Sequence, residues 1–366
     1  MNNLDEEDRN AIRESLSRFL AAEADESALR RGIDLAPGYS PGLWQQVCEM
    51  GLPGIAVPEE FGGVGGGAKD VEMVCSELGK SLLPIPFVES CVIGATLLTA
   101  SSGCANLRQV INAVVSGKSI VAVGGDASFV PLQDHDHSLV FNDDQTVSGV
   151  TSLVLHATLS DFFLLGTGSS GNTKVVIVPK SERITFEPQR ANDPLLRPAR
   201  VSFNNAAAIG LKELTPTDLE NARMRGVAAL AALQAGAARA IFEITVEYLK
   251  TRYQFGRPIG SFQALKHMAA DLLIEVESAT SAAQAAADAI DQNAPEVGRT
   301  VALAGFVCSD AFRDVAAQAI QMHGGIAYTQ EHIAHLYWRR SRAFAPMLGS
   351  AQKHREDYLT AWEKVA

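Results

Sequence analysis

One stretch of this sequence combines the side chains that suit a planar, anionic ligand. It runs from Thr251 to Gln263, and its glycines and proline interrupt helical periodicity. Arginine pairs with phosphate oxygens, amide side chains donate hydrogen bonds, and aromatic rings cover a flat heterocycle. The stretch supplies all three types: Arg252, Gln254, Phe255, Phe262 and Gln263. This chemistry fits a dinucleotide, although the spacing by itself favours a plain helix–helix turn with a solvated arginine.

Three segments together resemble the acyl-CoA dehydrogenases, the flavoenzymes of β-oxidation. In the family's order they are Pro53-Gly-Ile-Ala-Val-Pro-Glu-Glu-Phe-Gly-Gly63, Arg252-Tyr-Gln-Phe-Gly-Arg-Pro-Ile259 and Gln321-Met-His-Gly-Gly-Ile-Ala-Tyr-Thr329. The second is similar to the family's RxxFGxPI segment. The third is similar to its QxxGGxGY segment, with Ala327 in place of the third glycine. Because the three segments span nearly the whole chain, the sequence is identified as a member of this family.

The resemblance implies where the chain contacts FAD. In the family the last two segments reach across a subunit interface to the FAD of a neighbour. Arg252 would pair with the pyrophosphate, and Gly324 and Gly325 would let backbone N–H groups approach the phosphates closely. The remaining expected contacts donate hydrogen bonds, pack on the cofactor or lie nearby: Gln254, Gln321, Phe255 and Gln263.

The family's catalytic base has no counterpart at the expected position. A glutamate in the family removes the α-proton of an acyl-CoA while FAD accepts the β-hydride. The resemblance places this base beyond the Gly324-Gly325 pair and directly before a Gly-Thr pair. Here the corresponding residues are Leu348 and then Gly349-Ser350. Because leucine cannot accept a proton, we assign no catalytic residue to this chain.

Some family members carry the base on the first long helix of the C-terminal bundle instead. Counting back from Phe255 places that position at Gly226, which is not acidic. Glu220 lies about a turn and a half away, where a carboxylate near a helix N-terminus is favoured by the helix dipole alone. An active homotetramer with a relocated base, and a flavin-free scaffold, remain as alternatives.

The segments that should touch the flavin ring are altered as well. Typical members have a Thr-Glu-Pro…Gly-Ser-Asp stretch and a Trp-Ile-Thr strand. Here the first reads Gly124-Gly-Asp-Ala-Ser-Phe-Val-Pro131 and the second reads Leu153-Val-Leu155. The chain therefore keeps the residues that would contact the FAD of a neighbour and lacks those that would contact the flavin ring in its own site.

The resemblance thus predicts the non-catalytic subunit of a heteromeric acyl-CoA dehydrogenase, most simply a heterotetramer. A homologous partner would supply the glutamate and bind most of the acyl-CoA, and an electron-transfer flavoprotein is the expected acceptor. Some bacterial α2β2 enzymes of this kind act on steroid side-chain CoA esters, and Glu77-Leu-Gly-Lys-Ser-Leu-Leu-Pro84 resembles bacterial members. Steroid degradation is accordingly the expected branch of lipid metabolism, by analogy.

Composition agrees with a globular enzyme of the cytoplasm. The chain has 366 residues, 47% of them hydrophobic, and a net charge of −11, which argues against a nucleic-acid partner. Five scattered cysteines without a CxxC pair indicate reduced thiols. No signal peptide, membrane span or metal site is expected, since Glu331-His-Ile-Ala-His335 is not an HExxH motif.

The elements that must position these residues follow the order helical, β, helical. Residues 1–118 read as an all-helical domain, residues 119–210 as an antiparallel β-domain, and residues 211–366 as a helical bundle. The family's fold has the same order: it is an α+β multidomain arrangement with an N-terminal all-α domain, a middle antiparallel β-barrel-like domain and a C-terminal four-helix bundle. The expected long helices are 217–252, 265–291 and 297–323, and the expected strands lie near 120–123, 139–141, 152–155, 162–165, 174–178 and 199–203.

Overall fold

The computed structural model of the chain describes residues 4–35, 38–101, 105–124, 139–167, 174–211 and 214–363. They form two compact units, each assembled from separated segments. The first unit contains Met1–Leu4, Arg30–Asp70 and Pro84–Gly226, and the second contains Asp5–Leu29, Val71–Leu83 and Val227–Ala366. The three predicted domain ranges, 1–118, 119–210 and 211–366, stay a prediction.

The first unit is built on two four-stranded sheets. One sheet has the strand order β2 (Leu139–Phe141), β3 (Thr146–Val154), β7 (Ala199–Ala207), β6 (Ile184–Pro188). The other has the order β1 (Val121–Gly124), β4 (Phe162–Thr167), β5 (Lys174–Pro179), β8 (Ile209–Gly210). The sequence predicted six of these strands and missed β6 and β8, of which β8 is only two residues long.

One strand pair corrects the expectation of an antiparallel domain. β1 pairs in parallel with β4, with Val121 opposite Phe162, whereas every other pair between these strands is antiparallel. The chain leaves the sheet that contains β1, forms β2 and β3 in the other sheet, and returns as β4 in the same direction as β1. Such a long crossover allows parallel pairing, which a short hairpin cannot make.

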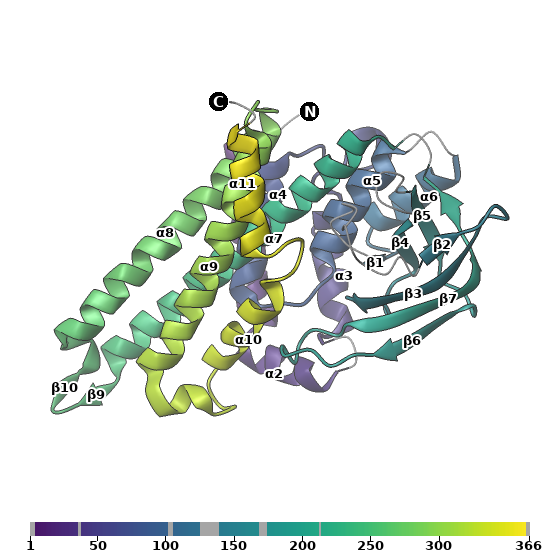
Figure 1. Cartoon of the computed structure of the whole chain (residues 1–366). Coiled ribbons are helices and arrows are strands. Elements are labelled where there is room, and N and C mark those ends of the chain that lie inside the picture. Colours follow the sequence, from purple (N-terminus) through teal and green to yellow (C-terminus); the bar gives the residue numbers. More distant parts are fainter. Residues whose placement is uncertain are drawn as a thin grey trace. The chain divides into compact units, whose positions relative to one another are not determined.

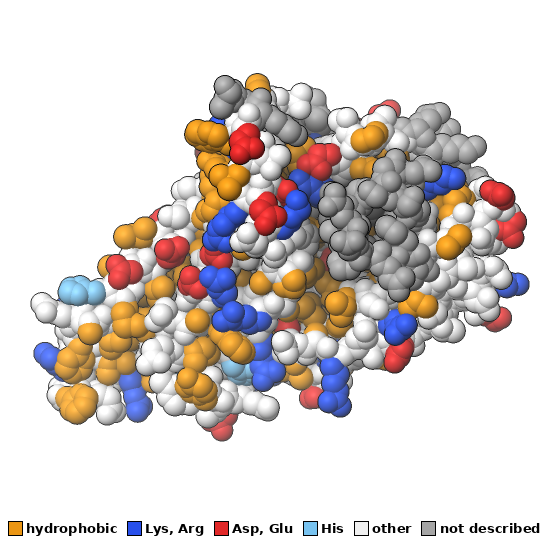
Figure 2. Space-filling view, viewed as in Figure 1, with side chains coloured by type: hydrophobic (Ala, Val, Ile, Leu, Met, Phe, Trp, Pro, Cys, Tyr) orange, Lys and Arg blue, Asp and Glu red, His pale blue; other side chains and the backbone are white. Residues whose placement is uncertain are grey.

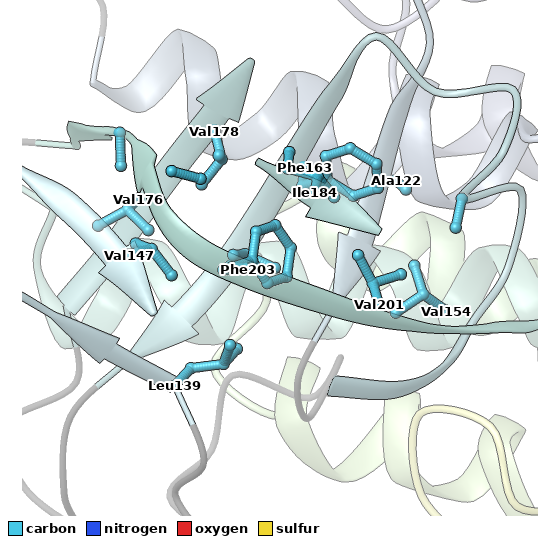
Figure 3. Packing of buried hydrophobic residues seen from close by; sticks show 14 of the residues in the cluster. Ala122, Leu139, Val147, Val154, Phe163, Val176, Val178, Ile184, Val201 and Phe203 are labelled. Carbon is cyan, nitrogen blue, oxygen red and sulfur yellow. The ribbon is translucent and has the colours of Figure 1, made fainter. Parts of the chain in front are cut away.

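The core of this unit lies between the two sheets (Figure 3). Along β7, Ala199, Val201 and Phe203 are buried at alternate positions, as expected for a strand with one face on a core. The ring of Phe163 on β4 meets that of Phe203 edge to face, with centroids 5.8 Å apart. Since β4 and β7 belong to different sheets, this pair joins the two layers.

Helices complete the first unit. They are the end of α2 (Glu26–Asp34), α3 (Pro41–Glu49), the turns η1 (Leu52–Gly54) and η2 (Glu59–Phe61), η3 (Phe87–Gly94), α5 (Ala95–Ala100), α6 (Ala105–Val115) and the start of α7 (Pro216–Thr251). The sequence missed α2. The eight residues of η3 form a π-helix, which continues directly into α5.

The second unit is a helical bundle (Figure 1). It contains α1 (Glu6–Glu23), most of α4 (Ala68–Ser81), the rest of α7, α8 (Gln263–Asp291), α9 (Val297–His323), α10 (Ala334–Phe344) and α11 (Ala351–Glu363). The bounds of α9 match the predicted helix at both ends, and those of α7 and α8 agree within two residues. α8 and α9 lie side by side and are joined by a short turn.

Two glycines let α4 and α7 touch backbone to backbone. A Cβ at Gly236 would lie 2.0 Å from the carbonyl oxygen of Ser76, and one at Gly79 would lie 2.1 Å from that of Leu233. No side chain fits at either distance, so each helix presents a glycine to the other's backbone. This contact fixes the course of α7 inside the bundle.

Further expectations can be compared with the described residues. α7 is long and apolar enough to cross a membrane, but 67% of its most apolar window is buried inside the chain, as in a core helix. None of the four described cysteines forms a disulfide, and three of them are buried; Cys104 lies outside the described residues. In the described part of the chain, no three His, Cys, Asp or Glu side chains gather in a metal-binding arrangement.

The backbone contact between α4 and α7 predicts that Gly236→Ala destabilises the second unit. The added methyl group would overlap the Ser76 carbonyl, which belongs to a helix and cannot move alone, so the loss is on the order of 3 kcal/mol. Urea unfolding followed by circular dichroism measures it. Gly298→Ala on α9 is the matched control, because nothing lies within 4 Å of its Cβ position. Equal unfolding midpoints for both variants would show that the helices do not touch in this way.

Candidate functional site

The Arg252 segment forms a two-residue β-hairpin at the end of α7. The Arg252 N–H donates to the Tyr248 carbonyl at 2.9 Å, and then β9 (Tyr253–Gln254) pairs with β10 (Arg257–Pro258). Phe255 and Gly256 form the turn with φ angles of 53° and 77°. Positive φ at both positions is typical of a type I′ turn. Phenylalanine is disfavoured there by about 1–2 kcal/mol, and strain of this kind often marks a functional position.

The hairpin displays an aromatic ring at its tip. Phe255 is 91% exposed, and its ring meets that of Phe262 edge to face with centroids 6.1 Å apart. The Arg257 guanidinium lies over the other ring at 4.1 Å. Arg257 thus contacts Phe262, and Phe262 contacts Phe255, and these contacts hold the tip outward. A ring displayed in this way is available to a ligand or a partner.

The second segment ends α9. Gly324 caps the helix with φ 66°, and its N–H donates to the carbonyl oxygens of Gln321 and Ile320. A Cβ placed on Gly324 or Gly325 would meet nothing within 4 Å. The backbone of this turn is therefore open to a group approaching from outside.

A contact between Tyr248 and His323 brings the two segments together. The rings stack at 4.5 Å with an interplanar angle of 29°, and the Tyr248 hydroxyl donates to the His323 carbonyl at 3.4 Å. Tyr248 lies one helical turn before Arg252, and His323 directly precedes Gly324. The Tyr248–His323 stack therefore holds the ends of α7 and α9 next to each other.

All seven residues predicted from the sequence lie in the second unit, and all but the half-buried Gly324 are exposed. They sit on the hairpin, at the start of α8 and at the end of α9: Arg252, Gln254, Phe255, Gln263, Gln321, Gly324 and Gly325. Figure 2 shows hydrophobic and basic side chains together at the end of the bundle that carries the hairpin (lower left). In a chain of net charge −11, exposed Arg252, Arg257 and Lys266 make this end locally basic. That charge favours an anionic ligand.

At the expected base position the structure has a buried, unreactive side chain. Leu348 is 8% exposed and adopts a left-handed φ of 54°. Gly349 follows with φ 114°, packed so closely that a Cβ there would lie 2.9 Å from Cε1 of His354. This tight packing against His354 holds the turn that carries Leu348.

The alternative base position is also occupied by structural groups. Gly226 is buried. Glu220 accepts two hydrogen bonds from the guanidinium of Arg223, at 2.8 Å and 2.7 Å. Both oxygens of this carboxylate are thus engaged by one guanidinium, in the bidentate geometry of a structural ion pair. These contacts favour the structural interpretation of Glu220.

The segments altered at the expected flavin ring are partly described. Leu153 is 66% exposed with φ 59°, at an irregularity of β3, and its N–H donates to Oε1 of Gln189 at 2.8 Å. It offers neither an aromatic face nor a hydroxyl. Of the other altered segment, residues 125–131 lie outside the described part of the chain.

A largely buried acid–base pair in the first unit was not predicted from the sequence. Glu89 lies in the π-helix η3, and its Oε2 is 4.0 Å from Nε2 of His156. Burial raises the pKa of Glu89 to about 7. The sequence signal was a single glutamate in the apolar run Phe87–Gly94, and π-turns often mark functional positions. His156 directly follows Leu155, which stands where the family has its flavin-contacting threonine.

Comparison with known proteins identifies the family. The model of the acyl-CoA dehydrogenase N-terminal domain matches residues 6–118, and that of the C-terminal domain matches residues 217–361. The acyl-CoA dehydrogenase IpdE2 of Mycobacterium tuberculosis is 34% identical over 351 residues, which cover 95% of this chain and 95% of that protein.

Solved structures share the fold over the whole chain. The ChsE4-ChsE5 complex from Mycobacterium tuberculosis is similar with a TM-score of 0.87 at 23% identity, covering 100% of this chain and 99% of the other. A steroid ACAD variant, Tcur3481-Tcur3483, has a TM-score of 0.86 at 23% identity and covers 98% of both chains. Two further structures of this fold, with TM-scores of 0.85 and 0.83, contain FAD. The predicted fold class is confirmed, and the chain belongs to the acyl-CoA dehydrogenase family.

Proposed function

We propose that this chain is the non-catalytic subunit of a heteromeric, FAD-dependent acyl-CoA dehydrogenase of the cytoplasm. It pairs with a homologous subunit and lends the hairpin and the α9 turn to an FAD at the shared interface. The partner supplies the glutamate that removes the α-proton and the contacts to the flavin ring. One observation carries the proposal: the cofactor-binding side chains are displayed outward, whereas Leu348 stands at the base position.

The displayed residues fit FAD chemically. Arg252 and Arg257 offer guanidinium groups for a pyrophosphate, Gln254 and Gln321 offer amide donors, and Phe255 offers a flat apolar surface. The open turn at Gly324-Gly325 has room for a phosphate. Bound FAD supplies the acceptor for the β-hydride. The residues of this chain contribute only the binding and orientation of FAD, because Leu348 rather than a carboxylate stands at the base position.

The partners are inferred from relatives. The similar ChsE4-ChsE5 structure is described as a complex, which supports a second, homologous subunit and a heterotetramer. The similar steroid ACAD supports a steroid side-chain CoA ester as substrate, bound mainly by the partner. An electron-transfer flavoprotein is the proposed electron acceptor. Substrate and acceptor rest on analogy with these proteins.

Replacing Arg252 tests the proposal. In the complex co-expressed with its homologous partner, Arg252→Ala removes a charge-assisted hydrogen-bonded pair that contributes about 1.5–3 kcal/mol to FAD binding. The affinity of the complex for FAD should therefore fall about ten-fold or more. Arg252→Lys keeps the positive charge but loses the planar, two-pronged hydrogen-bonding geometry of the guanidinium. Its FAD retention should lie between that of the wild type and that of Arg252→Ala. Flavin absorbance after gel filtration, per complex, measures retention.

Arg200→Ala is the matched control, since Arg200 is an exposed arginine on β7 in the first unit. It removes the same charge and should leave flavin content unchanged. Full flavin retention by Arg252→Ala would remove Arg252 from the cofactor site.

A second candidate function, an active chain with a relocated base, is favoured by one observation. The side chain of Glu89 is only 15% exposed, and its pKa of about 7 suits a general base. Glu220, by contrast, is held by Arg223. Glu89→Gln distinguishes the two functions. Our proposal predicts unchanged turnover of the complex with an acyl-CoA, whereas a loss of about a hundred-fold or more would make Glu89 catalytic.

The same substitution changes stability in a pH-dependent direction. Since the pKa of Glu89 is raised on folding from 4.5 to about 7, the wild-type chain loses stability as pH rises through that interval. Glu89→Gln should therefore be more stable above about pH 7, by up to ~3 kcal/mol. Near pH 4.5 the two should be alike. Urea unfolding at both pH values measures this difference in stability, with Glu187→Gln at an exposed position as the control. Equal stability of the wild type and Glu89→Gln above pH 7 would refute the burial of Glu89.

A further inference from the structure

His323 carries a buried nitrogen that no group in the described structure satisfies. The residue is 4% exposed. Its Nδ1 lies 2.8 Å from the Ala319 carbonyl oxygen, and because a carbonyl only accepts, Nδ1 must carry a proton. Nε2 of the neutral ring is then a lone-pair acceptor, and it has no hydrogen-bond partner among the described residues. Such a group costs about 1–3 kcal/mol and calls for an explanation.

Two aromatic side chains enclose this ring. Tyr248 from α7 stacks on it at 4.5 Å. His332, from the segment before α10, lies at a centroid distance of 4.3 Å. The His332 Nδ1 accepts the Ala334 N–H at 3.2 Å, so this second ring is also placed by its backbone. Tyr248 and His332 are the titratable groups that the described structure places against His323.

We infer that neutral His323 is the positioning residue of the proposed FAD-lending site, and that its protonation releases the α7 hairpin from the α9 turn. The Tyr248–His323 stack joins these two ends. The consequence for FAD rests on the proposed function, whereas the release itself does not.

Protonation weakens the stack for a physical reason. A proton on Nε2 would be a buried donor without an acceptor, on a ring that also faces His332. Stacking of the charged ring on Tyr248 would recover part of this cost, on the order of 1 kcal/mol. The cost of burying the charged ring is larger than this gain. Burial lowers the pKa of His323 from its ordinary value of 6.5, and His332 lowers it further by a smaller amount.

The sign of the pH effect follows from this lowered pKa. Between the ordinary value and the lower folded value, the released state binds more protons than the stacked state. The stack is therefore fully favoured above about pH 6.5 and is lost as pH falls below it. The structure thus predicts acid-dependent opening of this end of the bundle.

Hydrogen–deuterium exchange of the co-expressed complex tests the inference. Exchange rates corrected for intrinsic chemistry are compared at about pH 7.5 and about pH 5.5, in peptides covering residues 252–262 and 324–328. In the wild type, protection should fall about ten-fold for each pKa unit of lowering. His323→Phe keeps a ring on Tyr248 but cannot titrate, so its protection should not change with pH.

The controls make each outcome decisive. His267→Phe on α8 removes an exposed histidine and should behave as the wild type. If His323→Phe does not fold, His323→Gln, which cannot titrate either, carries the same expectation. The inference is wrong if wild-type protection is independent of pH, or if both His323 variants lose protection in acid as the wild type does.

Flavin content separates this inference from the proposed function. Acid should release FAD from the wild-type complex but not from His323→Phe. If His323→Phe abolishes the acid-dependent exchange while Arg252→Ala leaves flavin unchanged, the positioning role stands and the FAD-lending function falls. If Arg252→Ala loses flavin but exchange in both segments ignores pH, the reverse holds.

Discussion

The proposed site depends on the backbone contact between α4 and α7. Gly79 and Gly236 remove the side chains that would separate the two helices, so the carbonyls of Leu233 and Ser76 fill the space. This fixes α7 within the bundle and thereby fixes where its last turn ends. Tyr248 on that turn then reaches His323 at the end of α9. The two motifs that the sequence separates by some seventy residues meet because of these two contacts.

The two units differ in what they retain. In the second, Phe255 is held in a costly left-handed turn and almost fully exposed, which is an unfavourable arrangement for a free monomer. In the first, the position of the flavin-contacting tryptophan is an exposed leucine, Leu153. Strain and exposure are kept where a partner's cofactor would meet the chain. Under the proposed function, the same division explains how a chain with Leu348 at the expected base position can belong to a family of enzymes.

Some of this arrangement could be predicted from the sequence, and some could not. The end of α9 was predictable because Gly324 directly follows a regular apolar pattern, and the absence of a base at Leu348 followed from motif spacing. The hairpin was not predictable, because propensity places glycine or asparagine, not Phe255, at a positive φ. The parallel pairing of β1 with β4 depends on a crossover through another sheet, which local pattern does not encode. Glu89 and His156, and likewise Tyr248 and His323, meet only through tertiary packing.

The central claim is that this chain shares an FAD site with a homologous partner. The most direct measurement is the visible absorption spectrum of the purified chain, alone and after co-expression with that partner. The account predicts a colourless chain and a yellow complex, with about one FAD for each pair of subunits. A chain that is yellow by itself and is bleached by an acyl-CoA would contradict it, because a base and a complete flavin site would then lie within this chain.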